Sequence, residues 1–94
     1  MAPDIESKLV TDFSVADRVE ARTVLEDLAG DAGDIACPRV LRCVVFLAQG
    51  NLNRLRHNAD HAKKDWRDVI YWAEYDEQDH RLRDFNEPFP VALD

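Results

Sequence analysis

Apolar residues recur along much of this chain at the three- and four-residue spacing that places them on one side of a helix. The clearest case is the segment 14–30, whose apolar stripe consists of Ala21, Val24, Leu25 and Leu28. Ser14 is a favourable helix-capping residue, and Asp17 follows it at the spacing of a capping box. Gly30 suits the end of a helix. The pattern therefore predicts a helix over residues 14–30.

A weaker apolar pattern precedes this helix and is formed by Ile5, Leu9, Val10 and Phe13. It suits a short helical turn packed against the same core, but the ends of chains commonly fray, so we expect residues 1–13 to be largely irregular. After the helix, two glycines and two aspartates in residues 30–34 predict a loop. A calcium loop of the EF-hand type is excluded, because its twelfth position, counted from Asp31, is Arg42 instead of glutamate.

The most continuous apolar stretch lies in residues 38–49. Pro38 suits the first position of a helix, and Gly50 suits the position just after its end. Apolar side chains cover most of the helix circumference, and the polar edge consists only of Arg39, Arg42 and Gln49. A helix of this kind packs on several sides, so we expect it at the centre of the fold, with Phe46 and Leu47 almost fully buried.

Two further helices are predicted after Gly50. Asn51 can cap a helix over residues 52–64, whose stripe consists of Leu52, Leu55, Ala59 and Ala62. Asp65 can cap the next, whose stripe consists of Trp66, Val69, Ile70 and Ala73. Residues 76–85 either extend that helix or form a fifth, and the prolines in residues 86–94 make this last segment irregular. We therefore predict an all-α fold: one domain over residues 1–94, a compact bundle of four or five helices around the helix 38–49.

The charges change sign twice along the chain. Residues 38–67 hold seven basic and two acidic residues, whereas residues 1–37 hold nine acidic and three basic ones, and residues 68–94 hold eight acidic and two basic ones. Two arrangements explain this pattern. Either the acidic flanks fold over the basic centre, or the basic centre is offered to a partner as a positive patch.

Composition and charge limit the classes of function that we expect for this protein. A net charge of −7 argues against general nucleic-acid binding and against adsorption to anionic membranes. No apolar run approaches the roughly 20 residues that a membrane-spanning helix needs. The first residues contain no apolar stretch of the secretory type, so we expect a cytoplasmic protein in which Cys37 and Cys43 stay reduced.

His57 and His61 have the spacing of zinc-binding helices. A third ligand would have to come from His80 or its acidic neighbours in residues 74–80. Both histidines lie opposite the apolar stripe of the helix 52–64, however, so we expect them on the surface and expect no metal or other cofactor. The chain also lacks a serine nucleophile motif, a phosphate-binding loop and a dinucleotide fingerprint. A metal-binding protein or small enzyme that uses His57, His61 and the acids 74–80 is the alternative.

Aromatic residues are concentrated in one short segment, where four of the eight in the chain fall within ten positions: Trp66, Tyr71, Trp72 and Tyr75. They are either core residues or part of a binding patch. Tyr71 and Tyr75 are four residues apart and project together, away from the core stripe. With their basic neighbours they form the candidate interaction surface, which comprises Arg54, Arg56, Lys63, Lys64, Arg67, Tyr71, Trp72 and Tyr75.

These features predict a small acidic helical protein that acts as a protein–protein interaction or regulatory module. Its partner is another protein or a second copy of the chain in a homodimer. A nucleic-acid-associated protein that uses the basic segment 38–67 is a further alternative, disfavoured by the negative net charge.

Overall fold

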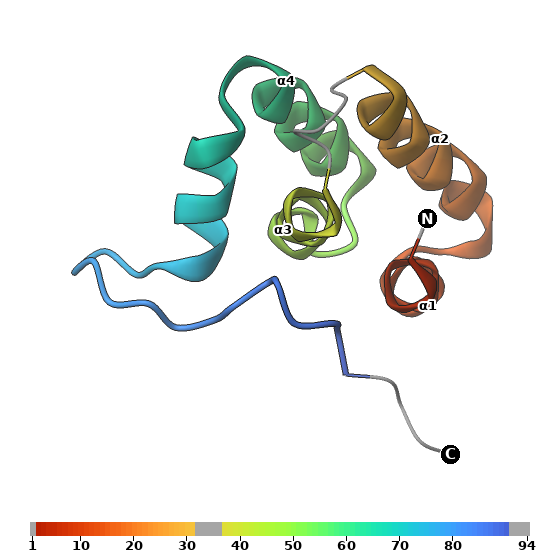
Figure 1. Cartoon of the computed structure of the whole chain (residues 1–94). Coiled ribbons are helices and arrows are strands. Elements are labelled where there is room, and N and C mark those ends of the chain that lie inside the picture. Colours follow the sequence, from red (N-terminus) through yellow and green to blue (C-terminus); the bar gives the residue numbers. More distant parts are fainter. Residues whose placement is uncertain (1, 32–36, 91–94) are drawn as a thin grey trace.

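The computed structural model describes residues 2–31 and 37–90, and the regular secondary structure within these ranges consists of four helices (Figure 1). Helix α1 spans Pro3–Asp12, α2 spans Val15–Asp31, α3 spans Pro38–Ala48 and α4 spans Leu52–Glu74. The predicted all-α class is confirmed. Of the loop predicted at residues 30–34, residues 30 and 31 belong to α2 and the others lie outside the described residues.

Helix α1 corrects the expectation that residues 1–13 are irregular. Pro3 occupies the first turn, where its missing N–H group costs no hydrogen bond. Ile5, Leu9 and Phe13 are buried in the core. Short helices gain most of their stability from tertiary packing. The weak apolar pattern therefore marks a packed helix, and these buried side chains hold it against fraying.

Helix α3 ends as predicted. Gln49 adopts the left-handed conformation, and Gly50 follows with a φ angle of 77°. A Cβ atom at Gly50 would lie 2.5 Å from the carbonyl oxygen of Asp12. Glycine is therefore needed here for its positive φ angle and for the close approach of α1 to the end of α3.

The burial of α3 differs from the prediction at Phe46 and Leu47, and also at Arg42, which belongs to the predicted polar edge but is buried. Its buried residues are Val40, Leu41, Arg42, Cys43, Val44, Val45 and Ala48. Phe46 and Leu47 are only half-buried, so the expectation that both are almost fully buried was wrong. Each of the two side chains lines a depression of the surface, which leaves part of it exposed.

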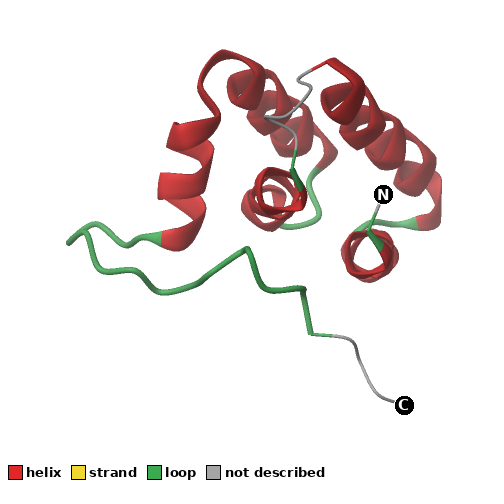
Figure 2. Ribbon diagram, viewed as in Figure 1, coloured by secondary structure: helices red, strands yellow, loops and turns green. Residues whose placement is uncertain are grey.

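The two helices predicted over residues 52–64 and 65–75 are the two halves of α4, which kinks at Asp65 (Figure 2). Asp65 has non-helical φ and ψ angles of −150° and 94°, and its carboxylate accepts the backbone N–H of Arg67 at 3.1 Å. The side chain of Asn51 accepts the backbone N–H of Arg54 at 3.0 Å. Both predicted capping residues therefore act as caps.

Each helix packs mainly against two of the others. Helix α3 packs along α4 and also contacts α1, whereas α2 packs mainly against α4 and α1. The core between them includes Leu25 and Leu28 of α2, Val44 of α3 and Leu55 of α4, all fully buried. Figure 1 shows α1 and α3 nearly end-on, with α2 and the first half of α4 lying across them.

The segment 75–90 is neither an extension of α4 nor a fifth helix, which corrects the prediction for residues 76–85. The chain instead turns at residues 76–79, and Tyr75 and Arg81 form an isolated antiparallel bridge. It then runs beneath α3 toward α1 (Figure 1). Phe85 and Phe89 are buried along this path, and the Phe85 ring lies 5.1 Å from that of Phe46. We call residues 75–90 the C-terminal strap.

Candidate functional site at the kink of helix 4

The basic residues of α3 are paired with acidic residues from the flanks. Arg39 donates to both carboxylate oxygens of Glu74, at 2.9 and 2.8 Å. Arg81 and the backbone N–H of Phe85, both in the strap, donate to the same carboxylate. Glu74 is fully buried. Burial alone would raise its pKa, but these hydrogen bonds and the nearby arginine charges hold the pKa below its ordinary value.

A second buried pair lies one turn further along α3. Arg42 donates to both oxygens of Asp4, at 2.8 and 3.1 Å, and also to the carbonyl oxygens of Phe85 and Asn86. The hydrogen bond from Arg42 lowers the pKa of Asp4 despite its burial. Asp4 also accepts the backbone N–H of Phe89 at 3.1 Å. The two arginines of α3 therefore hold α1, α4 and the strap together.

Several basic residues of α4 are also paired. Lys63 contacts Asp27 of α2 at 2.9 Å, and Arg56 forms an ion pair with Glu20 of α2. Arg67 lies 3.4 Å from Asp65 within its own helix. Of the five basic residues in the candidate interaction surface, Arg54 and Lys64 make no side-chain ion pair within the described residues. The structure thus favours acidic flanks folded over a basic centre.

The aromatic cluster is divided between core and surface. Trp66 is half-buried and packs against the core, whereas Tyr71 and Trp72 are 44% and 47% exposed. The rings of Tyr71 and Tyr75 stack with their centroids 5.3 Å apart, so they project together as predicted. The indole of Trp72 lies 4.7 Å from the imidazole of His61. The exposed part of the cluster is therefore on the second half of α4.

A groove lies beside Trp72, with a volume of about 330 Å³. It is lined by Leu47, Asn53, Arg54, His57, Asn58 and Trp72. The lining residues come from the end of α3 and from both halves of α4, so the kink at Asp65 brings them together. Sequence reasoning had selected Arg54 and Trp72 for an interaction surface. It missed Leu47 and Asn58, and it considered His57 only as a metal ligand.

The histidines are not assembled into a metal site. Within residues 2–31 and 37–90 no group of three His, Cys, Asp or Glu side chains could hold a metal ion. His57 is exposed as predicted, whereas His61 is half-buried and contacts Asp68 at 3.1 Å. His80 contacts Asp76 at 3.6 Å in the strap. The residues of the metal-site alternative are therefore not brought together in the described part of the chain.

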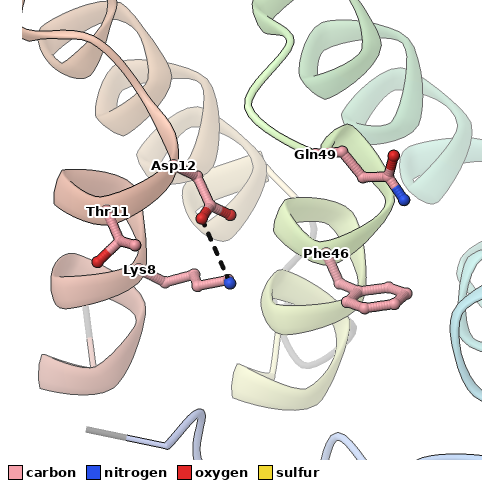
Figure 3. Close-up of a pocket in the computed structure, with 5 residues that line it drawn as sticks. All are labelled: Lys8, Thr11, Asp12, Phe46 and Gln49. Carbon is pink, nitrogen blue, oxygen red and sulfur yellow. Dashed lines mark ion pairs between the residues drawn. The ribbon is translucent and has the colours of Figure 1, made fainter. Parts of the chain in front are cut away.

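A second depression, of about 430 Å³, lies between α1 and the end of α3 (Figure 3). Figure 3 shows Lys8 reaching from α1 into this space, where its ammonium group pairs with Asp12 at 3.3 Å. The hydroxyl of Thr11 donates to the carbonyl oxygen of Ser7. Because these polar groups already have partners, this depression is a weaker candidate than the groove beside Trp72.

The two cysteines differ in exposure. Cys37 is exposed just before α3, and Cys43 is fully buried within it. Burial raises the pKa of the Cys43 thiol to about 12. The two thiols are not bonded to each other. Cys43 is therefore a packing residue, and not an activated nucleophile.

Among the described residues, no helix combines the length and the apolar character needed to cross a membrane. Comparison of the chain with protein-family models, with curated proteins and with solved structures found no match.

Proposed function

We propose that this protein is a non-enzymatic protein–protein interaction module whose partner contacts the surface around Tyr71, Trp72 and Arg54. The observation that carries the proposal is the exposure of two large aromatic side chains, Tyr71 at 44% and Trp72 at 47%, the second of which lines a groove. Tyrosine, tryptophan and arginine are enriched among the residues that dominate binding energy at protein interfaces. The three residues lie on one element, α4, with Arg54 in its first turn and the two aromatic residues after the kink.

The distribution of charges supports the same surface. Most basic side chains of the segment 38–67 are neutralised by acids of the same molecule, whereas Arg54 has no ion pair among the described residues. A cation beside exposed aromatic rings can therefore pair with a carboxylate of a partner without giving up an internal contact. The proposal places the protein in the cytoplasm, where the exposed Cys37 stays reduced.

We further propose that α3 is the helix around which the bundle is organised, and that the second half of α4 is the part of the bundle that the partner contacts. The partner is either a different protein or a second copy of the chain. These two cases differ in one measurable property, because only self-association changes the mass of the purified protein with its concentration.

The experiment compares wild type with a double variant, Tyr71→Ser and Trp72→Ser. Partner capture from the native host and light scattering of the purified protein are measured for each. We expect the double variant to keep its helical circular dichroism and to lose capture or self-association. Val19→Ser is the matched control, since it removes a side chain that is 73% exposed on α2. A double variant that is folded and associates like wild type would contradict the proposal.

A further inference from the structure

Asn58 is a buried polar residue without a partner in the described part of the chain. Its side chain lines the groove beside Trp72, and the residue is only 9% exposed. No hydrogen bond joins its amide to any described residue. Every fully buried side-chain nitrogen or oxygen atom of the described residues has a hydrogen-bond partner, so the amide atoms of Asn58 are among those that reach the surface of the groove. The donors and the acceptor of this amide are therefore not used within the protein and are open to water or to a ligand in the groove.

The other buried polar side chains of the described residues provide the contrast. Glu74 accepts hydrogen bonds from three residues, and Arg42 and Asp4 are joined by two hydrogen bonds and have further partners in the strap. This network joins α3 to α1, to the end of α4 and to the strap. Asn58 is the exception, and it lies where the surface is hollowed.

The remaining walls of the groove define what it can bind. Leu47 is half-buried and Trp72 is half-exposed, so together they offer an apolar surface to a ligand side chain. Arg54 is the cation of the groove, and it lies one helical turn before Asn58 on α4. The imidazole of His57 is exposed beside them. One wall is thus apolar, one is cationic, and an unpaired amide lies between them.

We infer that the groove binds an extended peptide segment of a partner protein, in which an apolar residue is closely followed by an aspartate or glutamate. A primary amide has both donors and an acceptor, so Asn58 can pair with the N–H and C=O groups of a peptide backbone. The apolar side chain packs on Leu47 and Trp72, and the carboxylate pairs with Arg54, whose guanidinium suits bidentate contact. The volume of about 330 Å³ is at the small end for ligand sites, as expected for a short segment.

This inference rests on the proposed function, and its test uses a defined probe. A phage-displayed library of random decapeptides is selected on the immobilised full chain. The enriched peptides are then synthesised, and their binding is measured by fluorescence polarisation. We expect enrichment of an apolar residue with an acidic residue one or two positions later.

Variants of the groove assign the contacts. Asn58→Leu keeps the side-chain volume and removes the amide, so we expect it to weaken peptide binding at least about tenfold. Arg54→Gln should weaken binding about fivefold and reduce its dependence on salt. Arg56→Gln is the matched control, because Arg56 is paired with Glu20 and does not line the groove. Methylation of the peptide backbone nitrogen beside the apolar residue tests the amide contact without any change to the protein.

Two results would overturn the inference: selection without enrichment of such peptides, or enriched peptides that bind Asn58→Leu as tightly as wild type. The proposed function has a separate readout. If Tyr71→Ser with Trp72→Ser still abolishes partner capture, the interaction surface stands and only the peptide chemistry is wrong. If that double variant captures the partner normally, the proposed function itself has failed.

Discussion

Glu74 joins three parts of the molecule through one carboxylate. It receives hydrogen bonds from Arg39 on α3 and from Arg81 and Phe85 in the strap, and it has no exposed surface. A buried carboxylate is stable only when charge and hydrogen bonds compensate its lost hydration. The strap therefore depends on this residue for its attachment to α4.

We expect Glu74→Gln to lower the free energy of unfolding by about 3 kcal/mol, because the variant leaves two arginines without their counter-charge. Both arginines still reach water, which places the cost at the lower end of the range for a broken buried pair. Urea unfolding measures the change. Asp84→Asn is the control, since Asp84 is an exposed partner of Arg81 and exposed pairs contribute little. Equal losses in the two variants would argue against a special role for Glu74.

The glycines provide a second test at the scale of single residues. Gly50→Ala places a methyl group at a φ angle of 77° and 2.5 Å from a backbone oxygen of Asp12. We expect a loss of about 1–3 kcal/mol or more. Gly30→Ala is the matched control, because Gly30 is helical and nothing lies within 4 Å of the added atom. It should gain up to about 1 kcal/mol from helix propensity, so thermal unfolding should shift in opposite directions for the two variants.

At the scale of elements, apolar periodicity and capping residues predicted most of the helices. The stripes around Leu25 and Leu55 and the caps at Asn51 and Asp65 are found in the structure. Helix α1 was predicted only as a short helical turn in an otherwise irregular segment, because its short pattern is stabilised by contacts with other elements and not by local propensity. The strap was not predicted. Its conformation depends on hydrogen bonds to Glu74 and Asp4, which lie far from Phe85 and Phe89 in the sequence.

The candidate site could be predicted only in part. Tyr71 and Trp72 followed from helix geometry, because they lie off the apolar stripe of their helix. Leu47 and Asn58 could not be predicted as groove residues, because no local feature of the sequence shows which positions the kink of α4 brings beside Trp72. One signal was present: Asn58 lies three residues after Leu55 and four before Ala62, so this polar residue shares a helix face with the core stripe.

The difference between a core position and a position at the groove gives a prediction for one leucine of α3 and one of α4. Leu55 is fully buried in α4, and Leu47 is half-buried at the groove. We expect Leu55→Ala to cost about 2–5 kcal/mol in unfolding free energy and Leu47→Ala markedly less, because the smaller loss of buried area leaves no closed cavity. Urea unfolding of both variants measures the difference. A cost for Leu47→Ala as large as that for Leu55→Ala would mean that the groove is closed in solution.

At the scale of the whole molecule, the alternation of charge along the sequence corresponds to ion pairs that form when the chain folds. The basic centre lies on α3 and α4, and the acids that neutralise it come from α1, α2 and the end of α4. A chain with net charge −7 thereby attaches both of its acidic flanks to one basic centre. The two pairs on α2 are exposed and contribute little individually, whereas breaking either buried pair on α3 would leave a buried charge without its partner, so the largest electrostatic losses are expected there.

This arrangement predicts how stability depends on pH. The pKa values of Asp4 and Glu74 are lowered on folding from ordinary values of 3.8 and 4.5. A lowered carboxyl pKa contributes stability that is present above the ordinary value and is lost as the pH falls through the folded value. We therefore expect the urea midpoint of the wild type to be nearly constant from pH 7 to 5 and to fall below about pH 4.5.

Comparison with Glu74→Gln isolates the contribution of the buried pair. Protonation of the unpaired acids also relieves repulsion in a molecule of net charge −7, so the wild-type profile alone combines opposing effects. Both proteins share that relief, but only the wild type has the Glu74 carboxylate to protonate. The difference in stability between them should therefore shrink as the pH falls from 5 to 3, since the wild type progressively loses what the variant never had. A difference that stays constant over this range would mean that the charge of Glu74 does not stabilise the fold.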